Sequence, residues 1–514
     1  MYKIGFQNFR RFTDFQPIEY KGITFLVGRN NAGKSTLVKA LLLINDFLKS
    51  DDITTFSFGS NSLEDTNIVT YGRAKNRNAT EDCIKFYYQI DNYTIEIVIS
   101  GDDDKTLATV HKVLITDISE NLEFLLEPRD KSIKISKLSS KNTDVEDPNN
   151  NTIRFLNSEI KRLREQIENK DLKKTSKEFI FLVEELNSIE KKRDLITPNK
   201  KSKKEENIYS ISTFFPTPYS LNEIIDFTIS EALFLYNRQF NEIQQGKEST
   251  TEFENYRGFY EESIKIEKSF QTFHDKINSL SIVYLGANPA KQSALFPIRD
   301  RNNALAQAIH DFYQLRISKG EKAYEFVEKW IVAFEIGYFF NILLHAGEAY
   351  EVRIDPENID MHLADKGMGS IQAMLLILRL ASIIHKRKFT SNIATIIIEE
   401  PELNLHPALQ SKLADLFLEV SLPPYNLNFI IETHSEYILR RSQVLVAEKE
   451  FAVGVNENPF CVYYFPKDSE NELQPYRLEY QADGVFSRNF GDGFFDEASS
   501  STLELLKLKR QKKA

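Results

Sequence analysis

One stretch of the sequence decides the fold: Ile23-Thr24-Phe25-Leu26-Val27-Gly28-Arg29-Asn30-Asn31-Ala32-Gly33-Lys34-Ser35. Its first five residues predict a buried strand, and apolar residues at helical spacing from Ser35 to Phe47 predict a helix. The loop between them fits the pattern G-x-x-x-x-G-K-[ST], which cradles phosphate groups in this context. A chance match in a glycine-rich turn is the alternative, but it leaves the flanking strand and helix unexplained.

Each part of this loop has a physical role in a phosphate site. Backbone N–H groups would surround the β-phosphate, and the helix dipole favours an anion there. Lys34 would reach the β- and γ-phosphate oxygens, and the Ser35 hydroxyl would hold Mg²⁺. ATP and Mg²⁺ are therefore the expected ligands. The predicted nucleotide-binding residues of the loop are Gly28, Asn30, Asn31, Ala32, Gly33, Lys34, Ser35 and Thr36.

Paired acids follow a second apolar strand. The run from Ala394 to Ile398 leads directly into Glu399 and Glu400. ATP hydrolysis at a phosphate loop needs one acid toward Mg²⁺ and one toward the attacking water. We expect Glu399 at the metal and Glu400 as the catalytic base. A buried strand that runs into a solvated acidic turn is the alternative.

A histidine follows a third apolar strand. The strand from Leu427 to Ile431 ends in Glu432-Thr433-His434-Ser435. Parallel strands bring their carboxyl ends to one edge of a sheet, where ligands bind. We therefore expect His434 to act catalytically, as a sensor of the γ-phosphate. A structural histidine is the alternative.

A second candidate anion site precedes the paired acids. The segment Asp365-Lys366-Gly367-Met368-Gly369-Ser370-Ile371-Gln372 opens an apolar helix that runs from Ala373 to His385. Its glycines and serine at a helix N-terminus again favour an anion. One nucleotide cannot use both sites on one chain, so Gly369 and Ser370 predict a homodimer in which each copy closes over the other's nucleotide. A plain capped helix is the alternative.

Composition limits the class of protein. The formal net charge of −10 argues against a protein coated in nucleic acid, although a local basic groove is compatible with it. Cys83 and Cys461 cannot build a disulfide framework, so a reducing cytoplasm is expected. Residues 1–12 lack the features of a secretory signal. The apolar run from Trp330 to Ala346 is expected to be a buried helix, so no membrane partner is predicted.

The order of these motifs resembles the head of ABC-class ATPases, specifically the SMC, RecF and OLD types. Asn8-Phe9-Arg10-Arg11-Phe12 resembles their N-F-R-x-F start, which implies that Arg10 lies near the nucleotide. The E-E-P-E run at Glu399 to Glu402, with L-H-P after it, is similar to OLD-like ATPases. In this resemblance Asn404 to Pro407 is a dimer-facing loop. Gly367 to Ser370 departs from the usual L-S-G-G-Q signature.

This resemblance implies an α/β fold: a split ABC-type P-loop ATPase head. Residues 1–140 would form its N-terminal part, with an antiparallel β subdomain at 81–135. Residues 141–275 would be a helical insertion, with a short coiled-coil-like hairpin at 153–196 and further helix at 208–271. The hairpin has an alternative reading as an arm that touches DNA or a partner. Residues 276–514 would complete the head.

The resemblance also implies a function. Thr433 to Arg441, with Gly491-Asp492-Gly493-Phe494-Phe495-Asp496, resembles ATPases of antiphage systems such as Septu. It implies a homodimer or higher homo-oligomer that hydrolyses ATP and controls a nuclease or other effector on a separate polypeptide, with no fused Toprim nuclease. One alternative is a RecF-like repair clamp that binds DNA, with the basic tail Lys507 to Lys513 and the hairpin arm on the duplex. Another is a nucleotide-gated scaffold with little turnover. DNA or RNA is the nucleic-acid partner to be considered for this chain.

Overall fold

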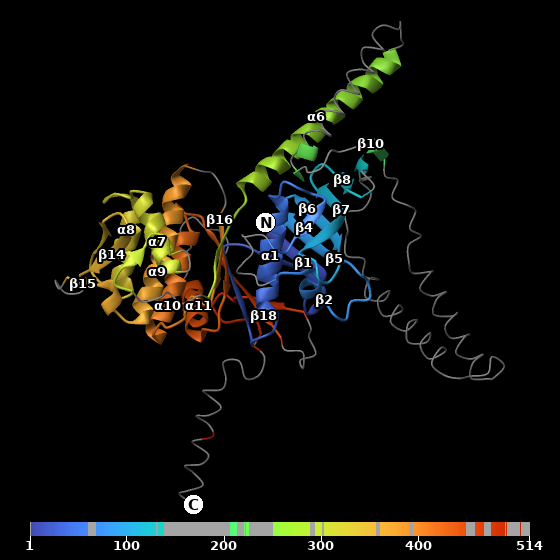
Figure 1. The fold of residues 1–514 in the computed structure, drawn as a ribbon. Helices are drawn as coiled ribbons and strands as arrows, with labels where there is room; N and C mark the ends of the chain where they lie inside the picture. Colours follow the sequence, from blue (N-terminus) through green and yellow to red (C-terminus); the bar gives the residue numbers. More distant parts are fainter. Residues whose placement is uncertain are drawn as a thin grey trace, which may run out of the picture.

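The computed structural model describes most residues of the N-terminal quarter of the chain and most of those between 250 and 488. The described residues are 2–59, 68–129, 132–137, 206–212, 220–221, 223–225, 250–287, 293–300, 303–355, 360–389, 394–448, 458–466, 474–488, 490 and 504. The predicted hairpin at 153–196, the 491–496 motif and the basic tail lie outside them. Two large sheets and a helical lobe that carries a third, small sheet make up the described body of the molecule (Figure 1).

A nine-stranded sheet carries the N-terminal part of the chain. Its main path runs β10-β9-β8-β7-β6-β5-β1-β2, every neighbouring pair is antiparallel, and β4 pairs with β7. The strands are β1 (Tyr2–Phe9), β2 (Phe12–Tyr20), β4 (Thr55–Ser57), β5 (Ile84–Ile90), β6 (Tyr93–Ser100), β7 (Leu107–Asp117), β8 (Leu122–Glu127), β9 (Ser132–Lys137) and β10 (Glu206–Ser212). The short helix α2 (Tyr71–Ala74) lies between β4 and β5 in the chain. The predicted antiparallel subdomain is confirmed.

A six-stranded sheet joins the two ends of the chain. Its order is β11-β16-β17-β3-β18-β19, and all neighbours are parallel except β18 and β19. The strands are β3 (Ile23–Gly28), β11 (Ser281–Leu285), β16 (Ala394–Glu399), β17 (Asn428–Glu432), β18 (Phe460–Phe465) and β19 (Tyr476–Leu478). The N-terminal strand β3 thus lies among strands from the last half of the chain, so neither end builds this sheet alone.

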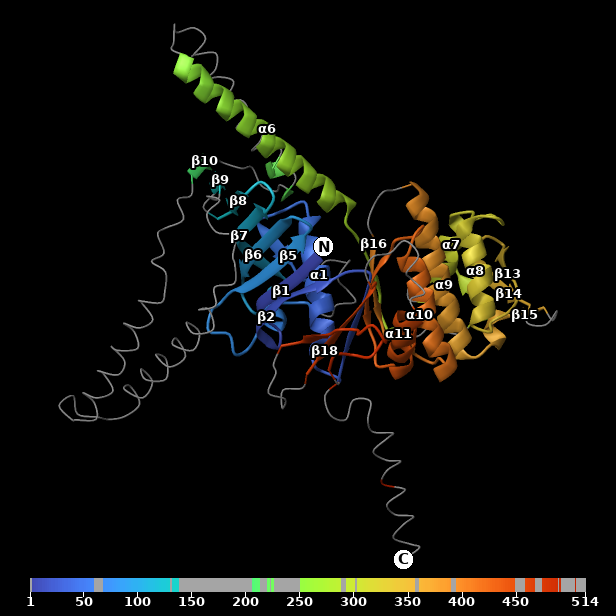
Figure 2. The same cartoon turned by 180° about the vertical axis from the view of Figure 1, so that it is seen from behind.

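The six-stranded sheet separates two hydrophobic cores. Successive residues of β3 point to opposite faces: Leu26 packs with the nine-stranded sheet and α1 (Lys34–Leu48), whereas Phe25 and Val27 pack with the helical lobe. Helix α1 therefore lies between the two sheets (Figure 2). This sandwich fixes the start of α1 at the carboxyl end of β3.

The helical lobe covers the other face of the six-stranded sheet. Its helices are α7 (Ala304–Gln314), α8 (Lys322–Ala333), α9 (Met368–Lys386), α10 (Pro407–Ser421) and α11 (Glu436–Glu448), with the short 3-10 turns η2 (Leu363–Asp365) and η3 (Arg387–Phe389). A small sheet of β12 (Phe296–Pro297), β13 (Phe340–His345), β14 (Ala349–Ile354) and β15 (Met361–His362) lies at its far end. Within the described residues, α9 is the one helix long and apolar enough to cross a membrane, and its most apolar window is 72% buried in the lobe.

Two predicted helices need correction. The run from Trp330 to Ala346 is not one helix: α8 ends at Ala333, Glu335 has a φ of +59°, and the chain returns as strand β13. Residues 206–212 form β10, paired with β9, whereas helix was predicted from 208 onward. Pairing with a strand far earlier in the sequence overrides the local preference.

A long helix, α6 (Thr250–Ser279), leads from the middle of the chain back to the six-stranded sheet. Its C-terminal part packs on the nine-stranded sheet, where Phe270 meets Phe124 at a centroid distance of 5.1 Å. Its N-terminal part projects away from the body (Figures 1 and 2). The helix crosses the predicted boundary at residue 275, so the insertion and the head share this element.

Candidate functional site

The phosphate loop connects β3 to α1 and needs its glycines. Gly28 has a φ of +142°, and a Cβ there would lie 2.4 Å from the carbonyl oxygen of Phe465. Gly33 has a φ of +105°, and a Cβ there would lie 2.5 Å from the ring of Phe12. Only glycine combines this backbone with such close neighbours. The predicted strand, loop and helix are all present in the predicted order.

The β1–β2 hairpin holds the loop from outside. The Arg11 guanidinium donates a hydrogen bond to the carbonyl oxygen of Asn31 and lies over the ring of Phe12, 5.5 Å from its centroid. Phe12 in turn packs against Gly33. The N-F-R-x-F segment therefore lies beside the phosphate loop, with Arg10 among the residues that line the same cavity.

Lys34 is buried at the first turn of α1. Its Nζ donates to the carbonyl oxygens of Gly28, at 2.9 Å, and Arg29, at 3.1 Å. The same Nζ lies 3.6 Å from Oε1 of Glu432. Burial lowers the pKa of Lys34, and the Glu432 carboxylate opposes that shift. The ammonium group is therefore held by the loop and by one acid.

Glu432 is a site residue that sequence reasoning missed. It ends β17, and its Oε2 accepts a hydrogen bond from the Ser35 hydroxyl at 2.9 Å. Its side chain is buried, and burial raises its pKa while Lys34 opposes the rise. The sequence feature that could have identified Glu432 is its position at the end of a predicted strand, two residues before His434. Its contact with Ser35 depends on β17 lying directly beside β3.

The paired acids take different positions. Glu399 pairs in register with Glu432 across the sheet but is not among the residues that line the cavity. Glu400 lines it, and its φ of +48° turns the chain sharply at that point. The backbone N–H of Glu400 donates to the carbonyl oxygen of Glu432 at 2.8 Å. The turn after β16 is thus fastened to the end of β17.

His434 lies across from Glu400. Its Nε2 is 4.0 Å from Oε1 of Glu400, and its backbone N–H donates to Oε1 of the buried Glu402 at 2.7 Å. Burial, with the nearby Lys34 charge, lowers the pKa of His434 to about 4. The imidazole is therefore neutral near pH 7 and can donate or accept a hydrogen bond.

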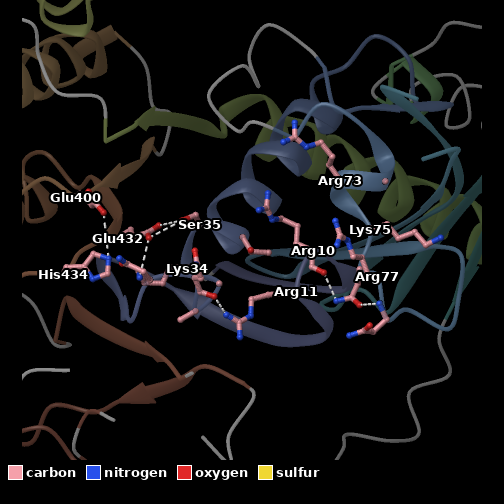
Figure 3. Close-up of a pocket in the computed structure, with 18 residues that line it drawn as sticks. Arg10, Arg11, Lys34, Ser35, Arg73, Lys75, Arg77, Glu400, Glu432 and His434 are labelled. Atoms are coloured by element: carbon pink, nitrogen blue, oxygen red, sulfur yellow. Dashed lines mark hydrogen bonds and ion pairs between the residues drawn. The ribbon is translucent and has the colours of Figure 1, made fainter. Parts of the chain in front are cut away.

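These groups line one cavity of about 970 Å³ (Figure 3). One wall holds Glu400, Glu432 and His434, and the phosphate loop forms the floor. The other wall is basic: Arg10, Arg11, Arg73, Lys75 and Arg77. Burial lowers the pKa of the Arg10 guanidinium, and the charge of Arg73 lowers it further. Positive charges that gather beside a phosphate loop favour the binding of a ligand with several negative charges.

The predicted signature residues lie outside this cavity. Gly369 and Ser370 are at the start of α9 in the helical lobe and do not line it. A Cβ at Gly369 would lie 2.6 Å from the carbonyl oxygen of Asn404, so the helix tip packs on the predicted dimer-facing loop. The single chain therefore brings together Arg10, Lys34, Ser35, Glu400 and His434, with residues 30–36 of the loop, but not the signature.

The donor set suits Mg²⁺. Among the described residues no three His, Cys, Asp or Glu side chains form a metal cluster. Mg²⁺ does not need one, because it binds one or two protein oxygens together with waters and substrate phosphates. The Ser35 hydroxyl and the Glu432 carboxylate are such oxygens, side by side at the start of α1.

The fold and the cavity define a P-loop nucleoside triphosphatase: a largely parallel sheet, a phosphate loop at the end of β3, and acids at the ends of β17 and β16 in the same sheet. A model of the family described as AAA ATPase domain matches residues 1–439, so the protein belongs to that family. Membership implies ATP binding and hydrolysis. A search of curated proteins gave no match.

Solved structures similar to this chain include a head domain and a recombination mediator. One is the Smc head domain with an extended coiled coil bound to the C-terminal domain of ScpA, from Pyrococcus furiosus, with 12% identity, 99% of this chain and 100% of that chain covered, and a TM-score of 0.34. Another is the recombination mediator RecF with ATPrS, with 11% identity, coverage of 93% and 97%, and a TM-score of 0.29.

Proposed function

We propose that this protein is a cytoplasmic, homodimerising ATPase that controls a separate effector, a nuclease, in defence against phage. The observation that carries the ATPase half is the cavity in which Lys34, Ser35, Glu400 and His434 meet beside a basic wall. The defence role rests on the resemblance of the motifs to antiphage ATPases.

The side chains divide the work of hydrolysis. Lys34 leaves the loop carbonyls to neutralise the β- and γ-phosphates, and Arg10 adds charge from the opposite wall. Glu400 orients the attacking water and takes its proton, while neutral His434 donates a hydrogen bond to the γ-phosphate. Mg²⁺, when bound, offsets the phosphate charge. Ser35 would hold it together with an acid from the end of a nearby strand.

The position of the signature residues supports the proposed dimer. Gly369 and Ser370 offer a helix N-terminus to an anion but lie away from the cavity of their own chain. In a two-fold dimer, each copy's helix tip covers the nucleotide of the other. ATP then holds the two copies together, and hydrolysis releases them. The effector senses which of these two states is present.

The variant Glu400→Gln tests this scheme. It keeps the size of the side chain but cannot accept the proton, so ATP-bound dimers should accumulate while phosphate release falls by about 100-fold or more. Light scattering at saturating ATP measures the dimer, and a monomeric variant contradicts the scheme. Phage plating on cells that carry the chain with its neighbouring reading frames gives the second readout. If cells resist phage although no nuclease or other effector gene lies beside the gene for this chain, the proposal of a separate effector is rejected.

The same preparations separate the two alternatives. A nucleotide-gated scaffold is rejected by phosphate release that disappears in Lys34→Ala. A repair clamp is supported by affinity for DNA that falls steeply with salt, and a slope near zero rejects it.

A further inference from the structure

Glu432 contacts both the Ser35 hydroxyl and the Lys34 ammonium group, which a bound nucleotide and its metal would need. Its Oε2 accepts from the Ser35 hydroxyl at 2.9 Å, and its Oε1 lies 3.6 Å from Nζ of Lys34 (Figure 3). The side chains of Lys34 and Glu432 are 2% and 10% exposed. A buried charge is stable only when paired, and each of these charges has the other as its neighbour.

We propose that Glu432 makes nucleotide binding depend on Mg²⁺. In the free protein its carboxylate neutralises Lys34 and holds Ser35. When a triphosphate takes Lys34, Glu432 becomes a carboxylate ligand of the Mg²⁺ bound at Ser35, directly or through a water. This inference rests on the proposed ATPase site and assigns it a further acid.

The charge balance explains the dependence on metal. A triphosphate that enters without a cation takes away the only charge paired with Glu432 in the described structure and places phosphate oxygens near its carboxylate. Like charges at close range in a buried site repel strongly. A divalent cation between carboxylate and phosphate removes that repulsion. Glu432 therefore weakens the binding of metal-free nucleotide.

Sheet geometry favours Glu432 over Glu399 for this role. The order β16-β17-β3 puts β17 directly beside the strand that ends in the phosphate loop, and Glu432 pairs in register with Leu26 of that strand. Glu399 is one strand further away and does not line the cavity. Both acids stand at the same sheet edge, which makes Glu399 a matched control.

The experiment measures the dissociation constant of a fluorescent, nonhydrolysable ATP analogue with Mg²⁺ and with EDTA. In the wild type we expect Mg²⁺ to strengthen binding greatly. In Glu432→Gln the ratio of the two constants should fall about 10- to 100-fold. Binding in EDTA should become tighter, because Lys34 has lost its competing carboxylate, and binding in Mg²⁺ should become weaker. Mn²⁺ binding, followed by electron paramagnetic resonance with the analogue present, should weaken in parallel.

Three further variants make the outcome specific. Glu399→Gln should leave the ratio near that of the wild type. Glu432→Asp keeps the charge and should keep most of the dependence on Mg²⁺, which guards against a misfolded glutamine variant. Ser35→Ala should weaken binding in Mg²⁺ without strengthening binding in EDTA. An unchanged ratio in Glu432→Gln, or a ratio that collapses in Glu399→Gln instead, overturns the proposal.

Failure of the ATPase site itself gives a different pattern. In that case the wild type binds the analogue in neither buffer, and Lys34→Ala behaves like the wild type. An analogue that binds the wild type equally in Mg²⁺ and EDTA, yet is lost in Lys34→Ala, supports the site and rejects the role of Glu432.

Discussion

Gly33 stands where the phosphate loop meets α1, and two constraints act on it at once. Its φ of +105° is a conformation that other residues adopt at a cost, and a Cβ would collide with the ring of Phe12. We expect Gly33→Ala to lower the free energy of unfolding by about 1–3 kcal/mol. It should also abolish nucleotide binding, because relief of the collision moves the loop. Urea unfolding and binding of a fluorescent ATP analogue measure the two effects.

The matched control is Gly320, in the turn before α8. Its φ is +86°, but a Cβ there would meet no atom within 4 Å. Gly320→Ala should therefore show the cost of the backbone conformation alone and leave nucleotide affinity unchanged. Equal loss of stability and full nucleotide binding in both variants would refute the role assigned to the contact with Phe12.

The sequence predicts those helices and strands whose formation depends on residues close together in the chain. The strand–loop–helix from Ile23 to Phe47 follows from local periodicity and a short motif, and the structure has it. Strand β10 and the contact between Glu432 and Ser35 depend instead on which strands pair across long separations. Local propensity carries no such information. The end of α8 escaped prediction because the positive φ of Glu335, not a proline, turns the chain.

One buried acid contributes to the attachment of helix α6 to the nine-stranded sheet. Asp117, at the end of β7, is 3% exposed and accepts a hydrogen bond from the Ser269 hydroxyl of α6. Burial raises its pKa, but hydrogen bonds to its carboxylate, led by those from Ser119 and Ser269, hold the pKa below the usual 3.8. Asp117→Asn should therefore destabilise the protein by about 1–3 kcal/mol. Hydrogen exchange should quicken at the C-terminal end of α6.

The sign of the pH dependence follows from that lowered pKa. The unfolded chain binds this proton more readily, so the contribution of Asp117 is complete above pH 3.8 and is lost as pH falls through its folded pKa. Wild type and Asp117→Asn should then converge in stability below that range. Asp104→Asn, in an exposed turn, serves as the control. A stability difference between wild type and Asp117→Asn that persists at low pH would show that the charge is not the cause.

The two halves of the proposed site lie apart on one chain. Lys34 is in the cavity, and Ser370 is at the tip of α9 in the helical lobe. In a two-fold dimer each composite site takes Lys34 from one copy and Ser370 from the other. Lys34→Ala damages one half of every site, and Ser370→Arg damages the other half by filling the interface without touching the cavity of its own chain.

Mixing these two inactive variants should therefore restore activity. Random assortment makes half of the dimers mixed, and each mixed dimer has one complete site, so phosphate release should recover to about a quarter of the wild-type rate. Ser370→Arg alone should still bind the ATP analogue, because its own cavity is intact, whereas Lys34→Ala should not. If the mixture stays as inactive as its components while ATP-driven dimers form, the signature helix does not act across the dimer, and the nucleotide is held by one chain alone.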